Sequence, residues 1–166
     1  PSQAGWMLAP IAVGALLTKP LVTRIVKRFG YRKTLAGNTL LIGINIMLLS
    51  QLNQTTPIWL SVPFLTFMGA CNSLQFSTMN TISIARLRPS QTSSGNSLLS
   101  VNQQLAISFG IGFGAMLLHL LTPARASLAQ TQTAFSYSFI ILGIMTILSG
   151  LYFLRLHRFD GKGLYQ

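Results

Sequence analysis

Five long apolar stretches follow one another along the chain, and short polar or basic segments separate them. Each stretch is long enough for a helix of about 20 residues, which is the length that the hydrocarbon core of a bilayer requires. The pattern predicts an all-α integral membrane fold with five transmembrane helices. We expect these helices at about 6–28, 34–52, 57–84, 96–121 and 133–156, followed by a cytoplasmic tail at 157–166.

The segments between the stretches alternate in charge. The first and third junctions are basic, the second (53–57) is uncharged, the fourth has only Arg125, and the chain after the fifth stretch is basic again. Lys and Arg are retained on the cytoplasmic side of a membrane. We therefore expect the first and third junctions and the C-terminus to face the cytoplasm, and the N-terminal end to face outward. The basic junctions contain Lys27, Arg28, Arg32, Lys33, Arg86 and Arg88.

The composition supports a membrane environment and argues against nucleic acid. Twelve Lys and Arg stand against a single acid, Asp160, and only 8% of the residues are charged. A soluble domain usually has about a quarter of its residues charged. The net charge of +11 could indicate a nucleic-acid partner, but such proteins gather their basic residues on one wet surface. Here the basic residues lie between apolar segments, so we expect the lipid bilayer as a partner and no nucleic acid.

Enzymatic chemistry has no support in the sequence. There is no nucleophile beside a base, no carboxylate pair and no cluster of metal ligands. The lone cysteine, Cys71, lies inside an apolar stretch, and we expect it to behave as a small buried hydrophobe. The sequence predicts neither an enzyme nor a bound cofactor.

The five stretches differ in how many polar residues they carry. The first, third and fourth are rich in them, whereas 34–52 and 133–156 are plain. Because a polar side chain facing lipid is costly, we expect the polar stretches inside and the two plain ones outside, covering them. The order polar, plain, polar, polar, plain is typical of inverted three-helix repeats in secondary transporters, with the first helix of the first triplet missing upstream.

Six side chains within the stretches are candidates for the wall of a substrate cavity. A face with amides and methionine suits a loose site for amphipathic molecules, because Met repacks readily. The same amides could instead form interhelical hydrogen bonds, and the one lysine could extend to the headgroups. The candidates are Lys19, Asn72, Gln75, Met79, Asn102 and Gln103.

The basic segment 27–33, Lys-Arg-Phe-Gly-Tyr-Arg-Lys, is a positive-inside loop on composition alone. Together with Pro1-Ser2-Gln3-Ala4-Gly5, Pro10 and the run Ser-Ser-Gly-Asn-Ser-Leu-Leu-Ser at 93–100, it resembles the major facilitator superfamily, in its fourteen-helix drug:proton antiporter branch. The resemblance extends over all five stretches. It implies that residues 1–166 are part of the carboxyl-terminal half, with five of the six helices of that bundle.

The resemblance assigns roles to particular residues. Arg28, Gly30 and Arg32 correspond to the family's cytoplasmic gating loop, in its second and weaker copy. Lys27 stands where the family often has an acid, so a strong charge-pair latch is not expected here. The positions of Gln75 and Gln103 carry Arg in the pattern that the chain most resembles, which implies that charge recognition is lost at both.

By this resemblance the chain is part of a secondary active transporter that exports drugs or other amphipathic small molecules across a bacterial inner membrane. The proton gradient would supply the energy. The proton carrier would lie in the missing amino-terminal half, because no stretch contains an acid. An uptake or metabolite transporter of the same fold and a non-transporting membrane scaffold fragment are the alternatives. We expect Gln75→Ala to shift substrate preference and Asn38→Ala to leave it unchanged.

Overall fold

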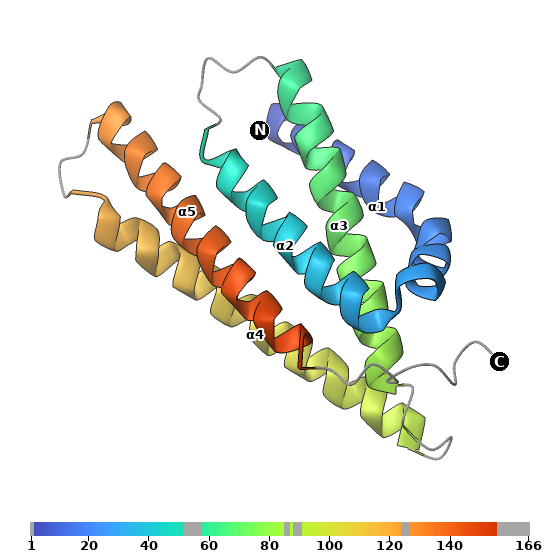
Figure 1. Ribbon diagram of the computed structural model, residues 1–166. Coiled ribbons are helices and arrows are strands. Elements are labelled where there is room, and N and C mark those ends of the chain that lie inside the picture. Colours follow the sequence, from blue (N-terminus) through green and yellow to red (C-terminus); the bar gives the residue numbers. More distant parts are fainter. Residues whose placement is uncertain (1, 52–57, 85–86, 88–90, 124–126, 156–166) are drawn as a thin grey trace.

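The computed structural model describes residues 2–51, 58–84, 87, 91–123 and 127–155, without the side chains of residues 2–8, 58 and 60. All regular structure in these residues is helical (Figure 1). The expected tail at 157–166 and the uncharged junction at 53–57 lie outside the described residues. The helices are α1 (Ser2–Phe29), α2 (Tyr31–Leu49), α3 (Ile58–Ile84), α4 (Thr92–Leu121) and α5 (Leu128–Phe153).

Four helices, α1, α2, α4 and α5, begin earlier than the apolar stretches indicate, and local backbone and capping chemistry explains the first residues of α2 and α5. Gly30 separates α1 from α2 with a φ of 77°, a left-handed conformation that glycine adopts readily. Its carbonyl accepts from the Thr34 amide at 3.1 Å, so α2 starts at Tyr31 rather than near 34. α5 starts at Leu128 rather than near 133, because the Ser127 hydroxyl and the Gln130 side chain form a reciprocal capping box.

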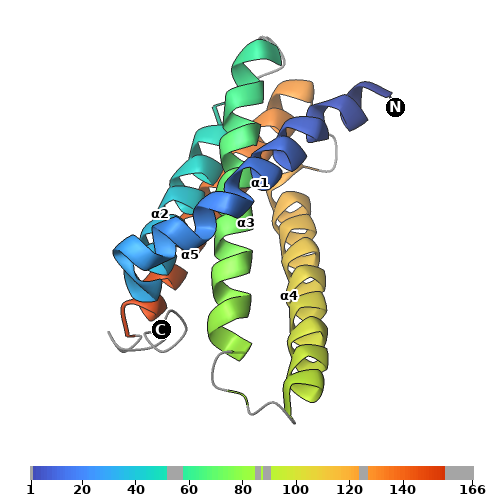
Figure 2. The same cartoon turned by 90° about the vertical axis from the view of Figure 1, so that its right-hand side faces the viewer.

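The first pair of closely packed helices is α1 and α3, which cross one another (Figure 2). The crossing depends on two glycines. A methyl group on Gly14 would overlap the Thr66 carbonyl, and one on Gly69 would overlap the Ile11 carbonyl. Small residues at a contact let helix backbones approach closely, and the resulting van der Waals packing helps to hold helices together in lipid. The α1–α3 contact is therefore backbone against backbone.

The second closely packed pair, α2 and α5, runs antiparallel (Figure 1). Gly43 and Gly143 face each other, and a methyl group on either would come to 2.9 Å from the other's carbonyl oxygen. Two turns away from the glycines, the Ser136 hydroxyl donates to the Ser50 carbonyl at 2.9 Å. Two turns in the other direction, Gly150 lies beside the Ala36 carbonyl. Positions equally distant from the two glycines therefore meet, so α2 and α5 are related by a local two-fold axis.

The placement of α2 differs from the expectation that it lies outside the other helices. It packs against both α5 and α3, and eight of its residues are buried. Its two asparagines, Asn38 and Asn45, are two turns apart and only 4% and 3% exposed. By contrast, α4 has no buried residue, although its glutamines and asparagines led us to expect it inside. The number of polar residues did not predict the location, because both asparagines of α2 lie on one stripe.

The surface of the described residues is apolar on every helix. Leu16, Trp59, Phe109 and Tyr152 are between 63% and 76% exposed. Three segments are long and apolar enough to cross a membrane: 9–49, which contains most of α1 and all of α2, then 92–121 and 128–153. Continuous apolar surface of this kind is unusual on a monomeric soluble protein. It is the surface expected of a protein surrounded by lipid.

Candidate functional site

The exposed face of α3 carries two of the predicted cavity residues. Asn72 and Met79 are both exposed, and they lie two turns apart. Phe76 lies between them on the same face and is 55% exposed. Sequence reasoning did not place Phe76 in the cavity wall, although its spacing of four residues from Asn72 was the signal. The face therefore combines an amide, an aromatic ring and a thioether.

Gln75 lies at the edge of this face and turns toward α2. Its Oε1 accepts from Asn38 Nδ2 at 2.9 Å, and its Nε2 donates to Thr39 Oγ1 at 2.8 Å. Asn38 Nδ2 also donates to the Cys71 carbonyl at 2.8 Å. We call Asn38, Thr39 and Gln75 the α2–α3 amide cluster. Because Gln75 and Asn38 are bonded to each other, substituting either one breaks the same bond, and the different effects expected of the two substitutions on substrate preference stay a prediction.

A second polar link joins α3 to α4. Gln103 Nε2 donates to Asn80 Oδ1 at 2.6 Å, so Gln103 is half-buried between the helices. Asn102, its neighbour, is exposed and lines a cavity of about 400 Å³ where the end of α3 meets the start of α4. The two predicted residues of α4 thus have different roles. The cavity is lined by Ser83, Ile84, Leu87, Gly95, Leu98, Leu99 and Asn102.

Lys19 is exposed on α1 and belongs to neither hydrogen-bonded cluster of the described residues. It precedes Pro20, which lies inside α1. The buried Thr18 hydroxyl donates to the Gly14 carbonyl at 2.8 Å, one turn back along the helix. The structure therefore leaves the Lys19 stem and ammonium free to reach either a cavity or the headgroups.

The residues of the predicted gating loop surround the break between α1 and α2. Arg28 is exposed in the last turn of α1, where a cation interacts favourably with the negative end of the helix dipole. Its guanidinium carbon is 5.7 Å from the centroid of the Phe29 ring, within the range of a cation–π contact. Arg32 is partly exposed in the first turn of α2, where the dipole disfavours a cation. Of the two predicted gating arginines, Arg28 is therefore stabilised by its own helix, whereas Arg32 needs a partner.

The polar groups gathered on α2, α3 and α4 are amides and hydroxyls. The only acid of the chain, Asp160, lies outside the described residues. Amides donate and accept hydrogen bonds at any physiological pH, but they do not carry protons. The arrangement can hold an uncharged polar group of a ligand beside apolar and aromatic contacts.

Comparison with known proteins identifies the family of the chain. The family model described as "Major Facilitator Superfamily" matches residues 1–164. The chain is 35% identical over 157 residues to the Pectobacterium atrosepticum protein named "Putative multidrug resistance protein MdtD", covering 93% of this chain and 34% of that protein. The Escherichia coli protein of the same name is 36% identical over 159 residues, covering 93% of this chain and 33% of that protein.

A third relative, the Haemophilus influenzae protein named "Probable transport protein HsrA", is 32% identical over 162 residues, covering 98% of this chain and 35% of that protein. The chain therefore spans about a third of the length of the curated relatives that it matches. No solved structure matches it. Because the family model covers nearly the whole chain, this multi-pass membrane protein belongs to the major facilitator superfamily.

Proposed function

We propose that this chain is the carboxyl-terminal part of a secondary active transporter that exports amphipathic small molecules in exchange for protons. The observation that carries the proposal is the match to the superfamily over residues 1–164, together with relatives named for multidrug resistance. The open face of α3 supports it. Asn72, Phe76 and Met79 offer one hydrogen-bonding group within an adaptable apolar surface, which suits ligands of varied shape.

The proposal assigns proton coupling to another part of the polypeptide. No described residue is an acid, and intramembrane proton carriers are usually acidic side chains or histidine. His119 is exposed near the end of α4, away from both amide links. These helices would therefore supply one wall of the substrate path, while the amino-terminal half would supply the proton carrier.

We further propose that all five helices cross a bacterial inner membrane. The α1–α2 and α3–α4 junctions and the C-terminus would lie in the cytoplasm. The cations of Lys27, Arg28, Arg32 and Lys33 at the first junction support this orientation. The long helices α1 and α4, with 28 and 30 residues, exceed the thickness of the hydrocarbon core and would tilt or project from it.

The glycines of α4 indicate where a further helix of the polypeptide would pack. α4 has no buried residue, and its Gly110 and Gly114 lie one turn apart on the same face with open space around both. Gly14 is in contact with the α3 backbone, whereas Gly114 has open space around it. We expect another helix to pack against α4 at Gly114, in the way that α3 packs against α1.

Transport by the full-length polypeptide tests the proposed function. The purified protein would be reconstituted in proteoliposomes with a cationic dye, and a proton gradient would be imposed. We expect dye movement that depends on the gradient and stops when an ionophore collapses it. Movement that ignores the gradient, or no movement for any of a panel of amphipathic dyes, would contradict proton-coupled export.

A stability comparison tests the proposed contact at Gly114. In the full-length polypeptide, Gly114→Leu should lower the thermal midpoint, because overpacking a close helix contact costs about 1–3 kcal/mol. Gly112→Leu is the matched control, because Gly112 is exposed and, two residues from Gly114, points to the opposite side of α4. Equal effects of the two substitutions would show that no helix packs closely at Gly114.

A further inference from the structure

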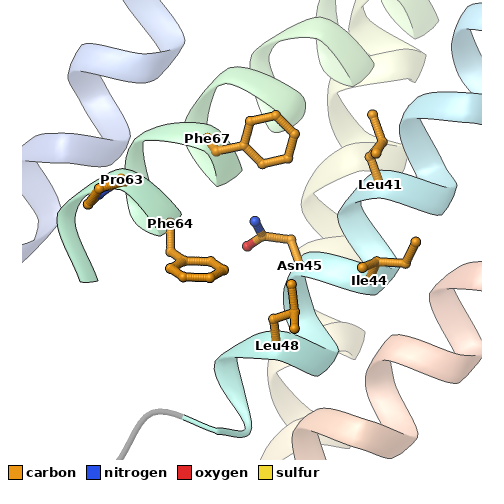
Figure 3. Close-up of a pocket in the computed structure, with 7 residues that line it drawn as sticks. All are labelled: Leu41, Ile44, Asn45, Leu48, Pro63, Phe64 and Phe67. Atoms are coloured by element: carbon orange, nitrogen blue, oxygen red, sulfur yellow. The ribbon is translucent and has the colours of Figure 1, made fainter. Parts of the chain in front are cut away.

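A cavity of about 270 Å³ lies between α2 and α3, near the Leu49 end of α2 and the Ile58 end of α3 (Figure 3). It is separate from the candidate cavity at the start of α4 and from the α2–α3 amide cluster. Its lining is apolar apart from one amide. The lining residues are Leu41, Ile44, Asn45, Leu48, Pro63, Phe64 and Phe67.

The amide in this cavity is unsatisfied. Asn45 is 3% exposed, and its Oδ1 has no hydrogen-bond partner among the described residues. Figure 3 shows its amide between Phe64 and Phe67 of α3 and the leucines of α2. A buried polar group without a partner costs about 1–3 kcal/mol. A side chain that retains this cost at the centre of an apolar cavity is a candidate for ligand recognition.

Comparison with Asn38 explains why the cavity exists. Asn38 and Asn45 lie two turns apart on the stripe of α2 that faces α3. At Asn38 the space between the helices is filled by Gln75, which bonds to the asparagine. At Asn45 the facing residues of α3 are Phe64 and Phe67, which offer no hydrogen-bonding group. Asn38 is therefore bonded to α3 through its Nδ2, whereas Asn45 makes no bond to α3 and lines an open space, although the Oδ1 atoms of both lack a partner.

We propose that this cavity binds a lipophilic compound with a hydroxyl group, which enters from the membrane and hydrogen-bonds to Asn45. A hydroxyl both donates and accepts, so it can bond with either end of the amide. The apolar body would contact the two phenylalanine rings and the aliphatic side chains. Leu41, Ile44, Leu48 and Phe67 are each 42–46% exposed, so the cavity opens to the surface that lipid would cover. This site does not depend on the proposed export function.

Photolabelling tests the proposal with probes that differ only at the polar end. The full-length polypeptide in lipid nanodiscs would be labelled with a medium-chain alcohol that carries a diazirine on its alkyl chain. The second probe is the methyl ether of the same alcohol, which cannot donate. We expect the alcohol to label the peptides containing residues 41–48 and 63–67 about three- to tenfold more than the ether, which is the range that one net hydrogen bond gives.

Two variants and a matched control identify the group responsible. Asn45→Leu should abolish the preference for the alcohol over the ether, while both probes still label the cavity. Phe67→Trp should reduce labelling by both probes, because the larger ring fills the cavity. Asn96→Leu, on the exposed face of α4, should leave both unchanged. Equal labelling of the wild-type cavity by the two probes, labelling only elsewhere, or an unchanged preference in Asn45→Leu would each overturn the proposal.

Discussion

The α2–α3 amide cluster gives a quantitative prediction about stability. Asn38 Nδ2 and Gln75 Oε1 are 2.9 Å apart, and Asn38 is almost fully buried. Interhelical hydrogen bonds in membrane proteins contribute about 0.6 kcal/mol on average and about 1.7 kcal/mol at most. Gln75→Leu removes two such bonds, so we expect it to lower the free energy of unfolding by about 1–2 kcal/mol.

The single substitution Asn38→Leu should be less damaging than its two lost bonds indicate. Asn38 Oδ1 has no partner among the described residues, so leucine also removes a buried unsatisfied acceptor. The double variant isolates the shared bond. We expect a coupling energy of about 0.5–1.7 kcal/mol between positions 38 and 75, measured by unfolding the full-length protein in mixed micelles of dodecyl maltoside and SDS.

A control cycle pairs Asn38→Leu with Asn72→Leu. Asn72 is on the same helix as Gln75 but exposed. The effects of these two substitutions on the free energy of unfolding should add to within about 0.5 kcal/mol. If the effects of substituting Asn38 and Gln75 were as additive as those of substituting Asn38 and Asn72, the Asn38 and Gln75 amides would not be bonded. The packing of α2 on α3 would then be wrong.

Three further predictions concern single helices, and all use thermal stability of the full-length protein in detergent. Gly14→Ala should destabilise by about 1–3 kcal/mol, because the added methyl overlaps the α3 backbone, and a neutral result would contradict the close crossing. Gly30→Ala should lower the free energy of unfolding by about 1–2 kcal/mol, because an alanine is strained at the φ of 77° found there. Its control is Gly37→Ala inside α2, where there is open space, and this substitution should be neutral or stabilising by up to about 1 kcal/mol. Ser127→Ala should cost about 0.5–2 kcal/mol by removing the N-cap of α5, and no change would show that the capping box is unimportant.

The sequence predicted the helical elements well because their signals are local. Apolar stretches, the glycine at position 30 and the short polar junctions are all read directly from neighbouring residues. The errors at the helix starts have the same local origin. Ser127 and Gln130 look like a polar loop until their reciprocal capping is considered.

The arrangement of the helices was harder to predict, because it depends on which residues meet. Counting polar residues placed α2 outside, yet its two asparagines lie on the stripe that faces α3, and one of them bonds to Gln75. The sequence identified Gln75 and Gln103 as polar groups inside the membrane. It did not show that each would bond to an asparagine on a neighbouring helix rather than face a cavity.

All the proposed roles require that five helices cross one membrane, with their basic junctions on the same side. Cysteine accessibility tests this most directly in a cysteine-free background, in which Cys71 and any others are replaced. Single cysteines at Lys33, Ser94 and Arg155 should react with a membrane-impermeant maleimide only from the cytoplasmic side, and cysteines at Gln51 and Ser127 only from the outside. Labelling of positions 33 and 94 from opposite sides would contradict the topology.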